Sequence, residues 1–276
     1  MLPNETPVER NERLFNSPNP VAFVTGSAAP RVGRRIAQYF LSQGFRLVFH
    51  AHQATAAADE FVAGINRAGQ PAILVIGEVQ DETNVSAWLT ETLNRLGRID
   101  VLVNSAAVWD PKPLELTRAI DYQHFFQVNT LGTALCGQHF GLAMAQQASG
   151  GAIINIGDWA VARPYRDFAA YFSSKASIIG LTQSLAVELA QRNPCVRVNA
   201  VLPGPIQLAE GISRERQQKI VDACLLKRAG SVDDLAQAVL FLATSPFITG
   251  VSLPVDGGRS IWAGDASDAV AHPKCV

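Results

Sequence analysis

The sequence predicts a single domain of the α/β class, built on a doubly wound parallel sheet. Short apolar runs alternate with segments of helical period along nearly the whole chain, as they do in folds of this class. The first apolar run stops at Gly26, and a helical segment follows a few residues later. The chain has 276 residues, 48% hydrophobic and 17% charged, which suits one large domain with a substantial core.

The expected strands are short, bounded apolar runs, typical of parallel strands that are buried on both faces. They occupy residues 20–25, 45–50, 72–76, 101–104, 152–156, 196–201 and 252–255. The expected helices occupy residues 34–43, 55–68, 85–96, about 118–147, about 168–191 and about 232–244. In the first helix Ile36, Ala37 and Phe40 share one face, and Gly44 ends the helix.

The two ends of the chain differ from this pattern. Residues 1–19 are polar and proline-rich, so we expect a flexible arm before the domain of residues 20–262. Residues 263–276 form a tail without a clear period. The start of the chain lacks the apolar run of a signal peptide, and no stretch approaches the ~18 apolar residues of a membrane span.

Charge and cysteine content limit the kinds of molecule that the chain is expected to bind. Lysine plus arginine (23) nearly balances aspartate plus glutamate (24), so we expect no nucleic-acid or membrane partner and a small-molecule substrate instead. The four cysteines, Cys136, Cys195, Cys224 and Cys275, lack the close spacing of a metal site. Reduced thiols, no metal and a cytoplasmic location are the simplest interpretation.

The turn after the first strand is suited to a dinucleotide. It runs Thr25-Gly26-Ser27-Ala28-Ala29-Pro30-Arg31-Val32-Gly33, and a helix follows. Small residues let the backbone approach a pyrophosphate, and the helix N-terminus offers free N–H groups and a positive dipole end. Between the first strand and first helix of an alternating chain, this turn predicts a Rossmann-type nucleotide site with Gly26, Arg31 and Val32 at the cofactor.

The residues after the second strand favour NADPH over NADH. An acid there would hold the adenosine ribose hydroxyls, but the chain has no acid before Asp59. Arg31, His52 or Thr55 could contact a 2′-phosphate, although His50 and His52, each taken alone, are more often solvated residues of a strand end. Glu78, after the third strand, either borders the adenine or is an ordinary surface acid.

A tyrosine and a lysine mark the expected catalytic end. Tyr171 and Lys175 are four residues apart in the helix of residues 168–191, so they share a face. An ammonium beside a phenol favours the phenolate and lowers the phenol pKa from about 10 toward the working range. The pair then suits proton transfer at neutral pH.

Taken together, these motifs make the chain resemble the short-chain dehydrogenase/reductase family over residues 20–262. The matching features, in order, are Thr25-Gly26…Gly33, Asp100…Asn104-Ser105-Ala106-Ala107, Asn129, Tyr171…Lys175, Pro203-Gly204 and Asp256-Gly257-Gly258. The resemblance implies that Tyr171 and Lys175 contact the cofactor, Lys175 at the nicotinamide ribose, and that Asn129 holds a water in a proton relay. It also implies a homotetramer.

The resemblance further implies a place for three other parts of the chain. Asn104 and Ala106 would lie along the cofactor, and Pro203-Gly204 would border the nicotinamide. Residues 206–226, long and charged, would form a substrate lid, although most of these charges suit a solvated helix face. Asn104 could instead be a strand cap, and Pro203-Gly204 a turn.

Two departures from the family pattern refine the hypothesis. Six residues separate Gly26 from Gly33, one more than usual, and Arg31 replaces the middle glycine. Asp158 stands thirteen residues before Tyr171, where the family carries serine. An ionised aspartate accepts hydrogen bonds but cannot donate them, so it suits a substrate with N–H groups.

The chain is similar to the pteridine reductases and dihydromonapterin reductases in having Asp158 with the Tyr171–Lys175 pair, an arginine in the glycine loop and an aromatic residue after the Asn104 stretch. By that resemblance a flat pterin would stack on Trp109 and meet Arg31, although Trp109 could also be simple packing. The main hypothesis is then an NADPH-dependent reductase of a dihydropterin C=N bond, with Tyr171 or Asp158 supplying the proton. One alternative is a carbonyl or 3-oxoacyl reductase. Another, from a different class, is a non-catalytic dinucleotide-binding regulatory protein.

Overall fold

The structure is a computed structural model that describes residues 5–206 and 211–262. Seven parallel strands form one sheet in the order β3-β2-β1-β4-β5-β6-β7. The strands are β1 (Val21–Val24), β2 (Arg46–Ala51), β3 (Ala72–Ile76), β4 (Val101–Asn104), β5 (Gly151–Ile156), β6 (Val196–Pro203) and β7 (Ser252–Val255). The predicted fold class is confirmed, and each strand lies within two residues of its predicted bounds.

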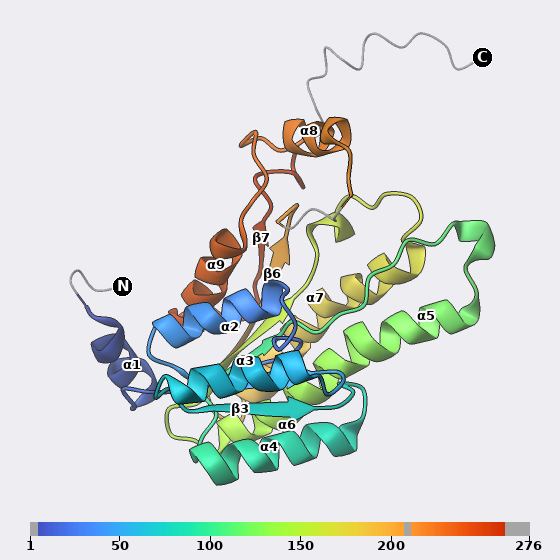
Figure 1. The fold of residues 1–276 in the computed structure, drawn as a ribbon. Helices are drawn as coiled ribbons and strands as arrows, with labels where there is room; N and C mark the ends of the chain where they lie inside the picture. Colours follow the sequence, from blue (N-terminus) through green and yellow to red (C-terminus); the bar gives the residue numbers. More distant parts are fainter. Residues whose placement is uncertain (1–4, 207–210, 263–276) are drawn as a thin grey trace, which may run out of the picture.

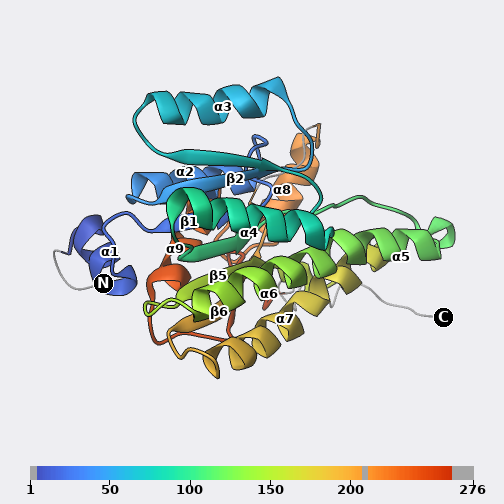
Figure 2. The ribbon, with the colours of Figure 1, turned by 90° about the horizontal axis from the view of Figure 1, so that it is seen from below.

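Helices cover both faces of the sheet. They are α1 (Pro7–Phe15), α2 (Val32–Ser42), α3 (Ala56–Arg67), α4 (Glu82–Leu96), α5 (Ala119–Phe125), α6 (Gly132–Ala145), α7 (Ala169–Ala190), α8 (Arg214–Asp222) and α9 (Val232–Thr244). Helices α2, α3 and α9 bury one core and α4, α6 and α7 the other (Figures 1 and 2). Helix α8 stands apart from these layers, at the top of Figure 1. Within the described ranges, no helix is long and apolar enough to cross a lipid bilayer.

The strand order creates a crevice at the middle of the sheet. The chain winds outward in opposite directions from β1 and β4, which pair with Val24 opposite Val103. The turns that leave these two strands therefore diverge, and ligands of open α/β sheets bind at such switch points. Thr25 ties the two turns together, because its hydroxyl oxygen accepts hydrogen bonds from the N–H groups of Ser105 and Ala106, both at 2.9 Å.

Part of the expected flexible arm, residues 1–19, is a packed helix. Thr6 and Glu9 form a capping box around Pro7, which starts α1. Asn11 is fully buried and its side-chain amide donates to the Gln43 carbonyl oxygen at 2.9 Å. The prediction of a flexible arm is wrong for residues 7–15, because polar side chains here satisfy backbone groups at the end of α2 instead of facing water.

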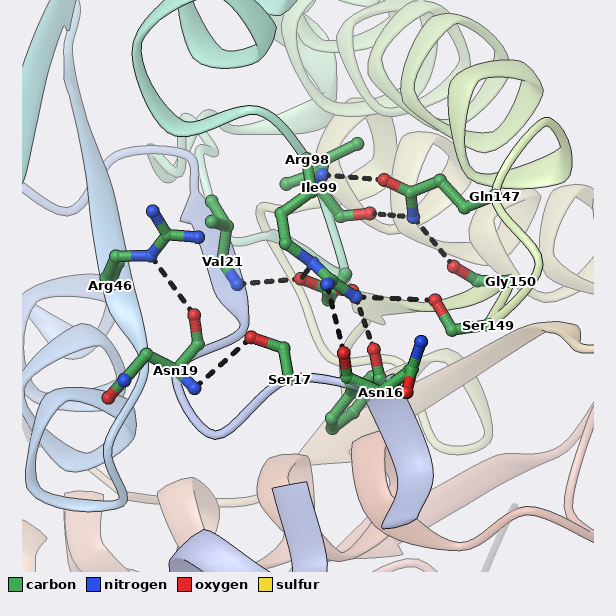
Figure 3. Close-up of polar contacts among 12 residues, drawn as sticks. Asn16, Ser17, Asn19, Val21, Arg46, Arg98, Ile99, Gln147, Ser149 and Gly150 are labelled. Atoms are coloured by element: carbon green, nitrogen blue, oxygen red, sulfur yellow. Dashed lines mark hydrogen bonds and ion pairs between the residues drawn. The ribbon is translucent and has the colours of Figure 1, made fainter. Parts of the chain in front are cut away.

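A buried ion pair secures the same end of the sheet. Asp100 is fully buried, and one of its oxygens accepts from the Arg98 guanidinium at 2.6 Å. The other oxygen accepts from the Val21 N–H at 2.8 Å, so the pair fixes the start of β1 beside β4. Arg98 also donates to the Phe15 and Asn16 carbonyl oxygens, which attaches the end of α1 (Figure 3). This network lies at the amino edge of the sheet.

Candidate active site

Three predicted catalytic side chains meet at the carboxyl end of β5. Tyr171 and Lys175 lie on one face of α7 and are 5% and 4% exposed. The Tyr171 hydroxyl donates to Asp158 Oδ2 at 2.8 Å, and Lys175 Nζ donates to the Ile156 carbonyl oxygen at 2.8 Å. The other Asp158 oxygen accepts from the Ala160 N–H at 2.8 Å, so this carboxylate also caps the short turn Trp159–Val161.

The electrostatics of this trio differ from the sequence prediction. Burial, followed by the charge and hydrogen bond of Asp158, raises the pKa of Tyr171 above its ordinary value. Burial lowers the pKa of Lys175 to about 8 and raises the pKa of Asp158. The prediction that Lys175 would lower the pKa of the phenol is therefore wrong, because the phenol is buried and a carboxylate contacts its oxygen directly. Tyr171 keeps its proton at neutral pH.

Asn129 connects two elements of the site. It lies in a π-helical turn, Phe126–Leu131, between α5 and α6. Its side-chain oxygen accepts from the Val108 N–H at 2.9 Å, and its NH₂ group donates to the Val108 carbonyl oxygen at 3.1 Å and to Ser174 Oγ at 3.0 Å. The side chain thus fastens the segment after β4 to α7, and its part in a proton relay stays a prediction.

The glycine turn is tightly packed at the switch point. Gly26 has φ +66°, and a Cβ there would lie 3.0 Å from the Ala106 Cα. A Cβ on Gly33 would lie 2.9 Å from the Gly26 carbonyl oxygen. Helix α2 begins at Val32, and the preceding Arg31 makes no side-chain cap, which leaves N–H groups of the first turn for a phosphate. The extra residue is accommodated without opening the turn.

His50 is a structural residue of this turn that the sequence did not reveal. It is 2% exposed, so its interpretation as a solvated strand end is wrong. Nδ1 accepts from the Gly26 N–H at 2.9 Å, and Nε2, which must then carry the ring proton, donates to the Gly77 carbonyl oxygen at 3.0 Å. Burial lowers the pKa of His50 to about 4. A neutral imidazole therefore connects the glycine turn to the end of β3.

The residues predicted to distinguish the two dinucleotides lie nearby. His52 and Glu78 are both exposed beyond β2 and β3, and their side chains approach each other at 3.3 Å. Arg31 is exposed and lines, with Arg34 and Arg35, a surface pocket of about 490 Å³ between α2 and the start of α9. His52 and Glu78 are thus brought together, while Arg31 lines a pocket to which neither of them contributes.

The side-chain oxygen of Asn104 is placed to accept a hydrogen bond from a ligand. Its NH₂ donates to Asn155 Oδ1 at 2.9 Å, but its own oxygen is buried without a partner among the described residues. Buried polar atoms are almost always paired in folded proteins, so this oxygen marks a place for a donor from outside the chain. Gly204 lies at the end of β6, where a Cβ would be 2.4 Å from the Asp256 Cα. Pro203-Gly204 therefore brings this loop against β7.

Aromatic side chains border the trio. Trp109 is 46% exposed and stacks on Phe168 with 5.0 Å between ring centroids. Phe168 meets the Tyr171 ring edge-on at 6.2 Å. Sequence reasoning missed Tyr165, which is also 46% exposed and meets Phe168 edge-on at 5.2 Å. Tyr165 lies in a loop with no periodicity, so nothing in the sequence indicated its position.

The fold and the site together define a class of protein. A seven-stranded sheet with a glycine turn at its switch point, beside a buried tyrosine and lysine on one helix, is the arrangement of a dinucleotide-dependent oxidoreductase. Among the residues that the structure describes, no three histidine, cysteine, aspartate or glutamate side chains gather as metal ligands do.

Comparisons with known proteins identify the family. The family model described as enoyl-(acyl carrier protein) reductase matches residues 27–260. A short-chain dehydrogenase/reductase of Aspergillus oryzae, astE, is 30% identical over 91% of this chain and 98% of its own length. A 3-oxoacyl-[acyl-carrier-protein] reductase of Synechocystis sp. is 36% identical over 88% of this chain and 97% of its own. The chain belongs to the short-chain dehydrogenase/reductase family and is an oxidoreductase of the kind that uses NAD(P)(H).

Two further matches agree with this assignment. The structure of a putative short-chain alcohol dehydrogenase from Sinorhizobium meliloti superposes with a TM-score of 0.81 at 26% identity, over 88% of this chain and 97% of that one. The (2S)-[(R)-hydroxy(phenyl)methyl]succinyl-CoA dehydrogenase subunit BbsD of Thauera aromatica is 33% identical over 89% of this chain and 98% of its own.

Proposed function

We propose that the protein is an NADPH-dependent reductase of a carbonyl group in a ketone or 3-oxoacyl compound. The observation that carries the proposal is the buried Tyr171 phenol, protonated at neutral pH and hydrogen-bonded to Asp158 beside Lys175. A phenol in that state is a proton donor. The relatives named 3-oxoacyl-[acyl-carrier-protein] reductase support this carbonyl alternative better than the pterin substrate that the sequence favoured.

The chemistry forms a C–H and an O–H bond as the C=O π bond breaks. A bound NADPH supplies hydride to the carbonyl carbon. Tyr171 donates its proton to the carbonyl oxygen, and Asp158, when protonated, returns a proton to the phenol along the 2.8 Å hydrogen bond. Lys175 places an ammonium group nearby that stabilises the developing negative charge. An ionised Asp158 would repel that charge, so carbonyl reduction requires its protonated form.

The preference for NADPH rests on charge around the adenosine end. No acid follows β2 before Asp59, and the Glu78 carboxylate lies 3.3 Å from the His52 imidazole. Arg31 lies exposed at the start of α2 and adds positive charge near the phosphates. In the proposed complex Lys175 holds the nicotinamide ribose, and the unpaired Asn104 oxygen accepts a donor from the cofactor side of the crevice.

Other residues would line the same cofactor. Gly26 and Val32 would approach the pyrophosphate, Ala106 would lie along the dinucleotide, and Pro203-Gly204 would border the nicotinamide. The tight packing of Gly26 on Ala106 supports this placement, because it leaves the backbone of both turns as the surface of the crevice.

A second candidate function is reduction of a pterin C=N bond. Asp158 favours it, because its carboxylate stands where a ring amino group could donate to it, and because its raised pKa would let it protonate a ring nitrogen. The exposed Trp109 indole offers a surface for a flat ring.

One assay separates the two candidates. NADPH oxidation is followed with ethyl acetoacetate, a 3-oxoacyl thioester, dihydrobiopterin, dihydromonapterin and dihydrofolate side by side. For a carbonyl reductase, Asp158→Ser should raise activity toward the ketones at high pH, where the native carboxylate is ionised. For a pterin reductase the same change should abolish activity. Asp59→Ser, an exposed aspartate on α3, is the matched control. Turnover of none of the five compounds would contradict the proposal.

We also infer a homotetramer, as the family resemblance implies. Strand β7 is an edge of the sheet, and Phe241, Phe247 and Val251 beside it are 52%, 102% and 39% exposed. Apolar side chains this exposed are typical of a surface that a second subunit covers. Light scattering coupled to size-exclusion chromatography should give four times the 29.6 kDa chain mass, and a monomer would contradict the inference.

A further inference from the structure

We propose that Trp109, Phe168 and Tyr165 form an aryl site, so that the preferred substrate is a ketone carrying an aromatic ring close to the carbonyl group. The inference rests on the proposed carbonyl reductase function and adds the substrate class. It starts from a feature that the catalytic chemistry leaves unexplained, namely two large exposed aromatic side chains beside a buried catalytic tyrosine.

Phe168 holds the aryl site together. This ring is 9% exposed and lies under both partners, stacked on Trp109 at 25° between ring planes and edge-on to Tyr165 at 75°. Tyr165 also meets Phe172 edge-on at 4.8 Å, which holds its ring from a second side. Aromatic contacts of this kind are specific in geometry, so the exposed rings are fixed in place before a ligand arrives.

The aryl site lies next to the reacting group. Phe168 precedes Tyr171 by three residues, and their ring centroids are 6.2 Å apart. Trp109 comes from the segment after β4, which Asn129 holds through Val108. Two separate loops at the carboxyl edge thus bring their aromatic side chains to one place. A carbonyl oxygen that accepts from the Tyr171 hydroxyl would leave a ring substituent within reach of these side chains.

Charged residues near the reacting group act on the Tyr165 phenol. Burial raises the pKa of its phenol, Asp158 raises it further, and Arg259 and the Trp109 indole N–H lower it. The phenol thus responds to the charges of Asp158 and Arg259, while nearly half of the residue is exposed. This arrangement suits an aromatic ring that packs on the exposed part, because ring–ring contact gives affinity that an alkyl chain of similar size does not.

The test compares an aryl and an alkyl ketone of similar size. Ethyl benzoylacetate and ethyl 3-cyclohexyl-3-oxopropanoate, which carry six-carbon rings at the ketone, are reduced with NADPH, and kcat/KM is measured for each. Ring–ring contacts of ordinary strength predict that kcat/KM for the aryl ketone is about threefold to tenfold higher than for the alkyl ketone. Trp109→Leu and Tyr165→Leu should remove that preference, mainly through KM. Tyr165→Phe keeps the ring and should retain the preference, as should the control Leu93→Ala, an exposed leucine on α4.

A binding measurement separates failure of this inference from failure of the proposed function. Calorimetry on the NADP⁺-loaded protein compares two esters of similar size without a reducible ketone, ethyl hydrocinnamate and ethyl 3-cyclohexylpropanoate. Tighter binding of the aryl ester, lost in Trp109→Leu, supports the aryl site even if neither ketone is reduced. Equal binding of the two esters, or an aryl preference that survives both leucine substitutions, overturns it. Unchanged NADPH affinity shows that the variants are folded.

Discussion

Replacing Asp158 by asparagine should make the Tyr171 phenol a stronger acid, so that it ionises at lower pH. The change removes one negative charge at an oxygen 2.8 Å from the phenol oxygen and keeps an amide oxygen that can accept from Tyr171. Two unit charges about 4 Å apart interact by about 4 kcal/mol at an effective dielectric constant of about 20, which corresponds to about three pKa units. Solvent that reaches the site reduces this, so we expect the pKa of Tyr171 to fall by about one to three units.

The assay uses the oxidative direction, in which Tyr171 must accept a proton from a secondary alcohol. Activity then rises with pH as the phenol ionises, and kcat/KM against pH reports the pKa in the free enzyme. In Asp158→Asn this rise should move to lower pH by about one to three units. Tyr171→Phe should lack the rise. A profile that stays in place, or moves to higher pH, would refute the argument that Asp158 sets the acidity of the phenol.

Three further changes test the fold around the site. Arg98→Met leaves the buried Asp100 unpaired and should cost about 3–5 kcal/mol of unfolding free energy, measured with urea, while kcat/KM stays near the native value. His50 has a folded pKa of about 4, below its unfolded value of about 6.5, so its contribution of about 3 kcal/mol is present above pH 6.5 and is lost as the pH falls toward 4. His50→Gln should lack that pH-dependent loss. Gly26→Ala should weaken NADPH binding, followed by fluorescence titration, by about tenfold or more, because a positive φ costs about 1–2 kcal/mol and the new Cβ meets Ala106.

Each of these has a comparison that isolates its cause. Gly69→Ala places the same strain at φ +80° with nothing within 4 Å of the Cβ, so it should lower stability without touching NADPH affinity. If both glycine variants lost the same NADPH affinity, the contact of the new Cβ with Ala106 could not be the cause of that loss. Urea curves of the native chain that do not change between neutral and acidic pH would contradict the account of His50. A large fall in kcat/KM for Arg98→Met would show that the two edges of the sheet are coupled.

The sequence predicted the parts of the molecule that periodicity and spacing determine. Apolar runs gave the seven strands, and the four-residue separation of Tyr171 and Lys175 predicted their common face. Helix α1 was not predicted because its buried face carries the polar residues Arg10 and Asn11. Polar side chains are buried only where other parts of the fold provide hydrogen-bond partners. Those partners belong to the end of α2, which no local pattern could reveal.

The electrostatics of the site depend on burial and on a side-chain contact, neither of which the spacing of residues in the sequence predicts. Asp158 was identified in the sequence as a departure, but burial of Tyr171, together with the charge and the hydrogen bond of Asp158, reverses the direction of the expected pKa change. The structural role of His50 and the position of Tyr165 were not predicted, for a related reason. Each lies at a strand end or in a loop, where function depends on which distant residues the topology brings near.

The ion pair of Arg98 and Asp100 lies at the edge of the sheet opposite the catalytic side chains. Substitutions there can change how long the folded chain survives heat or proteases while leaving the geometry of the reaction alone. Helix α1 belongs to that same edge, so a solid support attached through its exposed face would leave the crevice open to substrate. The protein therefore offers separate places for engineering durability and for altering what it reduces.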